Sequence, residues 1–398
     1  MTSAGQCIYL DHAATTPLRP EALEAMLPYL TEEYGNPSSA HGPGRRAHLA
    51  LDEARESVAQ DLGADPREIV FTSGGTEAIN LAIKGVAWAG KARGHRIITS
   101  AVEHHAVLHS VRHLEKFGFE VVELPVDRYG RLDPDHLAAA ITDRTILVSL
   151  MLANNEVGTI QPVASLVKRV REHRGVLVHL DAVQGARWLG ADVSGLDVDL
   201  LSLAGHKLEG PKGTGVLYVR RGTVLLSQLH GGSQERYRRA GTENVAGAIG
   251  FATALRLAWR ERAAVTPAVR ALRDRLRDAI LAVPGVELTG HRRERLPNHL
   301  SVIVREVDGS AVAMALDLDG IACSTGSACT SGDAEPSHVL TAMGYPEEEA
   351  RGALRLSLGR TTTAEEIDQV SRIAPATIAR LRAGAATLAA DPSGVGVG

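Results

Sequence analysis

Residues 176–207 read VLVHLDAVQGARWLGADVSGLDVDLLSLAGHK, and this stretch decides the fold. It contains two nearly continuous apolar runs, 176–181 and 198–204, both rich in Val and Leu. Such runs are typical of parallel strands that are buried on both faces. Because ligands of parallel sheets bind beyond the carboxyl ends of the strands, the polar residues after each run are the first candidates for a functional site.

The same pattern continues along the chain in both directions. Other strand-like runs lie at 68–73, 96–101, 120–125, 145–153 and 215–220. Helix-like segments lie between strands, at 76–90, 105–117 and 162–174. Strand–helix alternation of this kind predicts an α/β protein with a large, mostly parallel sheet.

A second, smaller unit follows this large one. From about residue 245 to 283 the pattern becomes strongly helical, and strand-like runs then occur at 299–305 and 354–359. A chain of 398 residues is also too long for one simple core, so two domains are expected.

The change of pattern gives approximate domain bounds. We place the large domain at 15–260, and we assign 1–14 together with 261–385 to a smaller α/β domain. The Ala/Gly-rich end, 386–398, is expected to be a flexible tail.

The composition limits the classes of function. With 44% hydrophobic and 23% charged residues the chain is an ordinary globular protein, and its net charge of −4 argues against a general nucleic-acid binder. No apolar run approaches the ~20 residues that a membrane helix needs, and no secretory signal is visible. Three cysteines are too few for a disulfide framework and agree with a reducing cytosol. We expect a cytoplasmic protein that binds neither membranes nor nucleic acid directly.

Polar groups follow the first of the predicted strands. The run 68–73 leads into SGGTEAIN (73–80). Small residues and a hydroxyl at the start of a helix make an anion site, because free N–H groups and the helix dipole point at it. A plain helix N-cap is the alternative. After the next strand come His104 and His105, which would suit a metal pair, although no third ligand lies at a recognisable spacing.

Three further polar residues are evenly spaced. Asn155 follows the run 145–153, Asp181 ends the run 176–181, and Lys207 follows the next run, with steps of 26 residues between them. One step is about one strand–helix unit, so the three side chains are expected at one edge of the sheet.

An acid, an amine and an anion site at one sheet edge match the needs of pyridoxal phosphate. This cofactor needs a lysine for its Schiff base, a carboxylate at its pyridine nitrogen and a helix N-terminus for its phosphate. The alternative is a nucleotide-binding α/β protein. Against that alternative, no GxGxxG or GxxxxGK[ST] motif follows the first strand.

Nine motifs, taken in order, resemble those of the NifS/IscS-like cysteine desulfurases. They are YLDHAATTPL (9–18), FTSGGTEAINLAIKG (71–85), EHHAV (103–107), NNEVG (154–158), LDAVQ (180–184), SLAGHKLEGPKG (202–213), AGTENV (240–245), STGSACTSG (324–332) and LRLSLGR (354–360). The resemblance covers nearly the whole chain and implies a fold-type I pyridoxal-phosphate enzyme with a large and a small domain.

The resemblance also implies roles for single residues in holding the cofactor. Lys207 is similar to the Schiff-base lysine, Asp181 to the partner of the pyridine nitrogen, and His104 to an imidazole that stacks on the ring and moves protons. Asn155 and Gln184 match residues near the phenolic oxygen of the cofactor. The phosphate-binding positions correspond to Gly75, Thr76, Ser202 and His206.

Substrate and partner contacts are implied in the same way. Arg355 matches the arginine that clamps the substrate carboxylate, a bidentate task suited to guanidinium, and Asn155 lies beside it. Thr242 would reach the phosphate held by the partner subunit, so a homodimer is implied.

The segment CSTGSACTSG (323–332) carries the expected nucleophile, Cys329. Its Gly, Ser, Thr and Ala neighbours pack poorly, so reactivity explains this thiol better than packing does. By resemblance, L-cysteine is converted to alanine while Cys329 takes the sulfur as a persulfide. No resident metal is expected, and a transient Fe–S contact at Cys329 is left open. Cys323 is interpreted as a small buried residue, with a resolving thiol as the alternative.

The segment after Cys329 resembles the branch of the family with a long, mobile cysteine loop, which can carry sulfur to an acceptor protein. An Fe–S scaffold and a tRNA-thiolation factor both fit this role. The rival functions are those of a selenocysteine lyase, an aminotransferase or another related enzyme of the same fold type, and that of a non-catalytic sulfur carrier. The presence of Lys207, Asp181, His104 and Cys329 together argues against the carrier.

Overall fold

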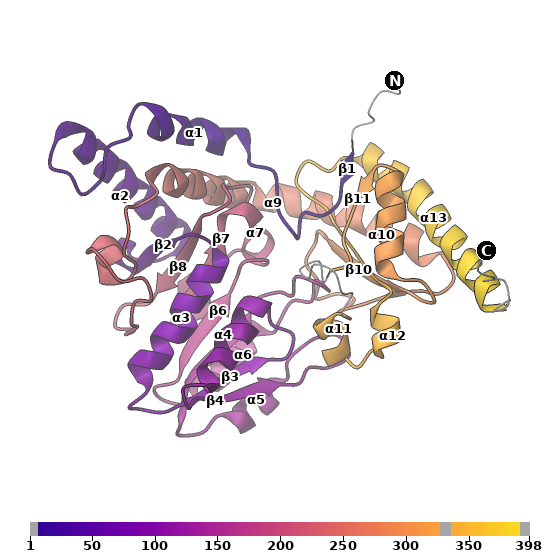
Figure 1. Cartoon of the computed structure of the whole chain (residues 1–398), viewed down its shortest axis with the longest axis horizontal. Coiled ribbons are helices and arrows are strands. Elements are labelled where there is room, and N and C mark those ends of the chain that lie inside the picture. The colour runs from indigo at the N-terminus through magenta and orange to yellow at the C-terminus, as the bar shows by residue number, and fades with distance from the viewer. Residues whose placement is uncertain (1–6, 327–335, 391–398) are drawn as a thin grey trace, which may run out of the picture.

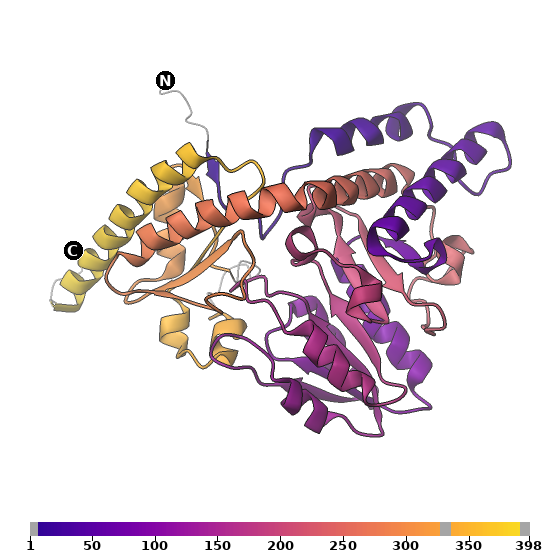
Figure 2. The same cartoon turned by 180° about the vertical axis from the view of Figure 1, so that it is seen from behind.

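The computed structural model describes residues 7–326 and 336–390. The predicted nucleophile Cys329 and the end of the predicted tail, 391–398, lie outside the described residues. The chain forms two lobes, and the long helix α9 (Val245–Leu281) runs along both of them (Figures 1 and 2).

The larger lobe is built on a seven-stranded sheet in the order β2-β8-β7-β6-β5-β3-β4. Its strands are β2 (Ile69–Thr72), β3 (Arg96–Ser100), β4 (Glu120–Leu124), β5 (Thr145–Met151), β6 (Leu177–Asp181), β7 (Leu200–Ala204) and β8 (Gly215–Val219). All run parallel except β8, which is antiparallel to both of its neighbours. The predicted α/β fold with a large, mostly parallel sheet is confirmed.

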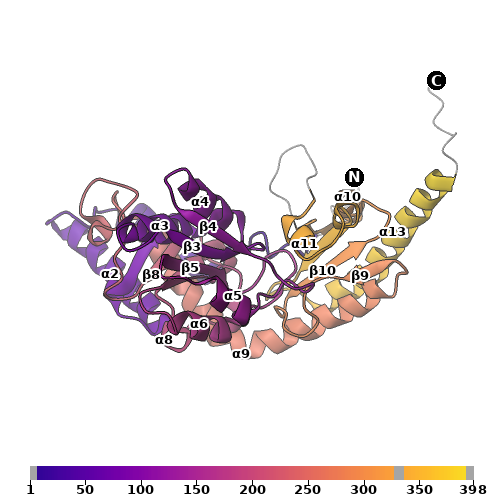
Figure 3. The same ribbon diagram turned by 90° about the horizontal axis from the view of Figure 1, so that it is seen from below.

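Helices cover both faces of this sheet (Figure 3). Helices α3 (Gly75–Gly90) and α4 (His105–Glu115) lie on one face, and α5 (Pro134–Ala140), α6 (Val163–Arg171) and α8 (Val193–Leu196) lie on the other. Every residue of β5 is buried, which explains its uninterrupted apolar sequence. Helix α6 instead buries one stripe at helical spacing, formed by Val163, Leu166, Val167 and Val170.

Two N-terminal helices, α1 (Pro20–Thr31) and α2 (Gly42–Leu62), pack against the first part of α9. The short helix α7 (Ala186–Leu189) also contacts α9. Helix α9 therefore belongs to the large lobe at its start, although its second half packs against the small lobe.

The smaller lobe contains a three-stranded antiparallel sheet in the order β12-β10-β9. Its elements are β9 (Val286–Leu288), β10 (His299–Val304), α10 (Gly309–Leu318), α11 (His338–Ala342), α12 (Glu347–Ala350), β12 (Ala353–Ser357) and α13 (Ala364–Ala390). The N-terminal strand β1 (Ile8–Tyr9) pairs in parallel with β11 (Ile321–Ala322). Ile8 and Leu10 are buried in the core of this lobe, so the start of the chain packs against a region more than 300 residues away in sequence.

Two of the predicted domain bounds fall inside helices of the structure. The predicted division at 260/261 falls inside the single helix α9. Helix α13 extends to Ala390, so residues 386–390 of the predicted flexible tail are helical instead. Among the described residues, no helix is long and apolar enough to cross a membrane.

Candidate active site

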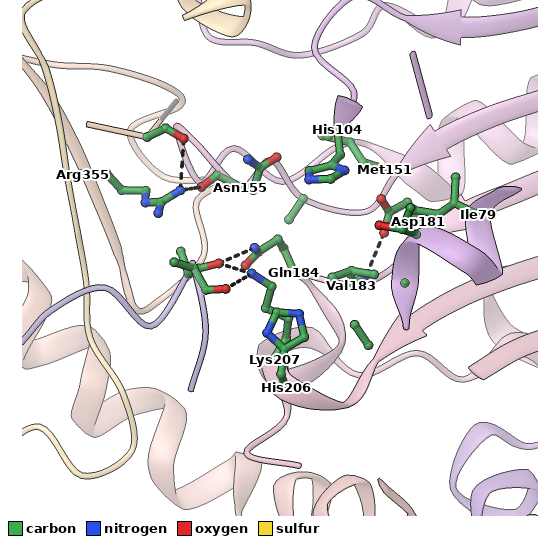
Figure 4. Close-up of a pocket in the computed structure, with 17 residues that line it drawn as sticks. Ile79, His104, Met151, Asn155, Asp181, Val183, Gln184, His206, Lys207 and Arg355 are labelled. Atoms are coloured by element: carbon green, nitrogen blue, oxygen red, sulfur yellow. Dashed lines mark hydrogen bonds between the residues drawn. The ribbon is translucent and has the colours of Figure 1, made fainter. Parts of the chain in front are cut away.

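A cavity of about 300 Å³ opens at the carboxyl ends of β5, β6 and β7 (Figure 4). The N-terminal turn and two residues of the small lobe, Gly326 and Arg355, complete its lining. Most of the predicted site residues line this cavity, namely Gly75, Thr76, His104, Asn155, Asp181, Gln184, His206, Lys207 and Arg355.

The sheet explains why the three evenly spaced residues converge. Strands β5, β6 and β7 are neighbours and parallel, so Asn155, Asp181 and Lys207 all follow or end strands at the same edge. All three line the cavity, although they are far apart in sequence. The predicted convergence of an amide, a carboxylate and an amine is therefore present.

Lys207 ends a 3-10 turn (Gly205–Lys207) that directly follows β7. Its Nζ donates hydrogen bonds to the main-chain oxygens of Ala13 and, at 2.6 Å, Ala14. Gln184 Nε2 donates to the same Ala13 oxygen at 2.8 Å (Figure 4). The N-terminal turn thus holds the amine at the edge of the cavity.

Asp181 is buried at the end of β6, and its Oδ1 accepts a hydrogen bond from the Val183 N–H at 2.9 Å. Burial raises the pKa of Asp181 to about 6, although the Val183 hydrogen bond and the Lys207 charge lower it. A buried carboxylate of this kind gains stability from a cation beside it. This environment fits a protonated ring nitrogen of pyridoxal phosphate.

His104 is the N-cap of α4, and its Nδ1 accepts a hydrogen bond from the Ala106 N–H at 3.1 Å. Desolvation by its surroundings, together with the Lys207 charge, lowers the pKa of His104 to about 4. The ring is therefore neutral at pH 7. Since Nδ1 accepts, the hydrogen-bond geometry assigns the ring proton to Nε2.

The start of α3 supplies an anion site on the cavity wall. A side chain at Gly75 would lie 2.9 Å from Val183 Cγ2 and 3.3 Å from Ala204 Cβ, so glycine keeps the backbone close to these neighbours. The first N–H groups of a helix have no intrahelical acceptor and favour a negative charge. Gly75 and Thr76 thus fit a phosphate group.

Two predicted cofactor residues do not line this cavity. Ser202 is fully buried inside β7, where its hydroxyl is hydrogen-bonded to His179 Nε2 at 2.8 Å. The residue of β7 that does line the cavity is Ala204, so the structure does not bring Ser202 to the phosphate-binding positions. Thr242 lines a second pocket of about 220 Å³, together with Ser73 and Arg239.

Sequence reasoning missed two buried residues near the site. Glu103 Oε1 accepts hydrogen bonds from Ser100 Oγ at 2.7 Å and the Met151 N–H at 3.0 Å. Burial, with the nearby Asp181 charge, raises the pKa of Glu103 to about 8. His299 Nε2 is hydrogen-bonded to the main-chain oxygen of Asn155 at 3.1 Å. Glu103 closely follows the apolar run 96–101, and His299 begins the run 299–305. A polar residue in such a position was the signal that could have identified each of them.

Cys323 is half-buried in the small lobe, where burial and the charges of Asp11 and Asp317 raise the pKa of its thiol to about 12. The thiol is therefore protonated at neutral pH, which makes it a poor nucleophile. This environment supports the interpretation as a structural residue. The described residues contain no group of three or more His, Cys, Asp or Glu side chains that could hold a metal ion.

Comparison with known proteins agrees with this geometry. The family described as aminotransferase class-V matches residues 8–370. A cysteine desulfurase IscS of Methanosarcina thermophila is 49% identical over 382 residues, which is 96% of this chain and 94% of that protein. The cysteine desulfurase IscS of Dictyoglomus turgidum is also 49% identical, over 94% of this chain and 95% of that protein.

The chain belongs to the NifS/IscS-like cysteine desulfurases. A solved NifS-like protein shares the fold with a TM-score of 0.89 and 38% identity, covering 94% of this chain and 100% of that one. A NifS-like protein from Rickettsia africae gives a TM-score of 0.83 at 32% identity, covering 94% and 99%. The predicted membership in this family is confirmed, and the protein is a pyridoxal-phosphate-dependent cysteine desulfurase.

Proposed function

We propose that this cysteine desulfurase moves the sulfur of L-cysteine to Cys329 as a persulfide and then to an acceptor protein. The observation that carries the proposal is the convergence of Lys207, Asp181 and Arg355 on one cavity. An amine, a buried carboxylate and a guanidinium in one cavity provide a base, a partner for a ring nitrogen and a carboxylate clamp.

The cofactor is assigned to the residues that suit its parts. Asp181 would hold the pyridine nitrogen protonated, Gly75, Thr76 and His206 would bind the phosphate, and Gln184 and Asn155 would hold the ring from the side of its phenolic oxygen. When bound, pyridoxal phosphate supplies an electron sink for the carbon skeleton of the substrate. His104 would stack on the ring, and because its pKa is lowered to about 4 it would do so as a neutral imidazole.

Lys207 and Arg355 handle the amino acid itself. Arg355 binds the α-carboxylate, and Asn155 lies beside it. Lys207 would hold the cofactor through its amine, and the same amine would take the proton from Cα of the substrate. Nζ lies at the cavity edge, within hydrogen-bond distance of two carbonyls that orient it.

Sulfur transfer uses the residue that lies outside the described part of the chain. The Cys329 thiolate attacks the sulfur of the substrate, the Cβ–S bond breaks, and an S–S bond forms. The carbon that receives the electron pair takes up a proton and leaves as part of alanine. The persulfide then passes to an acceptor protein for Fe–S cluster assembly or tRNA thiolation. A transient contact between Cys329 and an Fe–S cluster would occur during that transfer.

A homodimer is part of the proposal. Thr242 does not line the cavity of its own chain, as expected for a residue that serves a partner subunit. Large hydrophobic side chains are exposed on and beside α1 and in the segment 224–237, namely Leu23, Leu27, Leu30, Tyr34, Val224, Leu226, Leu229 and Tyr237. A partner subunit that covered these side chains would remove them from water. The cytoplasmic location stays a prediction.

Intact-mass analysis after incubation with L-cysteine tests the proposal. We expect a gain of one sulfur atom on the peptide that contains Cys329, together with release of alanine. The Cys329→Ala variant is the control, since it should bind the cofactor but form no persulfide. Full alanine production by that variant would rule out the persulfide route. Selenocysteine lyase activity, the runner-up, would require turnover of selenocysteine with no turnover of cysteine.

A further inference from the structure

The proposed carboxylate clamp, Arg355, is held by a residue at the other end of the chain. Asp11 Oδ1 accepts a hydrogen bond from Arg355 Nη2 at 2.8 Å. The side chains are only 5% exposed for Arg355 and 19% exposed for Asp11. Since water screens such a pair weakly, removing one partner leaves a poorly solvated charge, and the pair is strongly coupled.

The remaining contacts of the guanidinium hold Nη1, and among the described residues they leave the buried Nε unsatisfied. Its Nη1 donates to the main-chain oxygens of Asn155 at 3.0 Å and Gly326 at 3.5 Å (Figure 4). Within the described part of the chain, Nε has no hydrogen-bond partner. Nε and Nη2 together form one fork that can bind a carboxylate with two parallel hydrogen bonds. Asp11 accepts from one nitrogen of this fork and helps to fix the plane of the guanidinium, while Nε keeps a donor that no described residue satisfies.

Main-chain pairing places Asp11 beside the strand that carries Arg355. Asp11 forms a parallel bridge with Ser357 of β12, and the Ser357 N–H donates to the Leu10 oxygen at 2.7 Å. The main-chain oxygen of Asp11 accepts a hydrogen bond from the Ala14 N–H at 3.0 Å, which closes a turn.

The same turn also binds the amine of Lys207. The main-chain oxygens of Ala13 and Ala14 accept hydrogen bonds from Nζ. One short turn therefore contacts both cations of the site, Lys207 through its carbonyls and Arg355 through the Asp11 carboxylate. Because the turn is closed by its own hydrogen bond, it sets the spacing between them.

We propose that Asp11 is a positioning residue that orients Arg355 and so selects substrates with a carboxylate beside the reacting amine. The inference rests on the proposed role of Arg355 as the carboxylate clamp. It concerns affinity for the carboxylate and not the chemistry at Cα or sulfur. Asp11 acts through Arg355, and it need not touch the substrate.

Two ligands that differ in the carboxylate separate this role from a general structural one. For Asp11→Ala we expect the KM for L-cysteine to rise about tenfold or more, with kcat within about threefold of the wild type. The dissociation constant of cysteamine, which lacks the carboxylate, should not change in calorimetric titration of the holoenzyme. An equal loss for both ligands, or no loss for either, would overturn the proposal.

A double-mutant cycle gives the sharper test. If Asp11 acts through Arg355, then Asp11→Ala should cause no further loss of L-cysteine affinity in an Arg355→Ala background. Additive losses would contradict the inference. Asp11→Asn keeps the size of the side chain and an acceptor oxygen, so it should lose less affinity than Asp11→Ala and guards against a folding defect.

Asp319→Asn is the matched control, because the Asp319 carboxylate accepts from Thr377 Oγ1 at 2.7 Å in the small lobe and does not line the cavity. This variant should retain the wild-type affinity for both ligands. A wild-type protein without desulfurase activity would contradict the proposed function. Unchanged L-cysteine affinity in both Asp11 variants would overturn only the role of Asp11.

Discussion

One wall of the cavity is made by the ends of parallel strands, whereas another is made by Ala13 and Ala14 of the turn at 11–16 and by Gly326 and Arg355 of the small lobe. The strand wall places its polar groups by main-chain pairing within one sheet, as for Asp181 at the end of β6. The turn wall depends on contacts between segments that are far apart in the chain, such as Asp11 with Arg355.

The two walls contribute different parts of the proposed function. The strand wall holds the groups assigned to the cofactor, and the turn wall orients the two cations that meet the substrate. Damage to the first should therefore abolish chemistry, and damage to the second should change affinity or stability. The following predictions test that division.

The largest effect is expected for Lys207→Ala on the strand wall. The variant loses both the anchor of the cofactor and the base, so alanine formation from L-cysteine should fall to the background level. The measurement is alanine and sulfide production, with borohydride reduction to locate any remaining cofactor adduct. A reducible adduct at another lysine with normal turnover would overturn the assignment.

Asp181→Ala should have the next largest effect. Without the buried carboxylate the ring nitrogen loses its charged partner, so kcat should fall by about 100-fold or more, in the range that loss of one preorganised electrostatic group produces. Steady-state kinetics with saturating cofactor measures this loss. Wild-type kcat in this variant would show that the strand wall does not control the electronics of the cofactor.

Thr16→Val tests the turn wall through stability. Thr16 Oγ1 donates to the His206 oxygen at 2.7 Å and accepts from the Glu209 N–H at 2.9 Å. Losing both hydrogen bonds should lower the free energy of unfolding by about 1–3 kcal/mol, as measured by urea denaturation.

The matched control is Thr31→Val, because the exposed Thr31 hydroxyl bonds only to Leu27 of its own helix among the described residues. It should change stability by no more than about 0.5 kcal/mol. Equal effects would mean that the turn is not specially anchored.

Glu103→Gln should have the smallest effect, visible as a pH dependence. The pKa of Glu103 is raised to about 8 from 4.5, so between these values the folded protein holds a proton that the unfolded chain releases. The contribution of this group to the stability of the wild type therefore falls as the pH rises from about 4.5 to about 8. Relative to the wild type, the Gln variant should gain unfolding free energy between pH 5 and pH 8. A difference that is constant over this range would mean that Glu103 is ionised in the folded protein.

Much of the strand wall could be predicted from the sequence. The apolar runs gave the order of strands along the chain, and the polar residue after each run gave Asn155, Asp181 and Lys207. A helix start rich in small residues gave the segment 73–80 as an anion site, and the resemblance singled out Gly75 and Thr76 within it. Ser202 was assigned by motif position, but Ala204 at the carboxyl end of β7 lines the cavity, whereas Ser202 lies two residues earlier inside the strand and bonds to His179.

The turn wall could not be predicted in the same way. Nothing in a short run shows that Asp11 meets Arg355, because that pairing depends on the bridge between Asp11 and Ser357. Glu103 and His299 were missed for a related reason. Burial changes their pKa values, and burial is a property of packing that a linear pattern does not contain.

The α/β class and the strand-end carboxylate and amine could be inferred from the amino-acid sequence, because strand periodicity is local. Membership in the desulfurase family followed from the resemblance of its motifs. Only the tertiary structure decided which carbonyls hold Lys207, which carboxylate holds Arg355 and which predicted residues reach the cavity. The physical reason is that strand periodicity is a local property, whereas the distance between two lobes and the desolvation of a side chain depend on the whole fold.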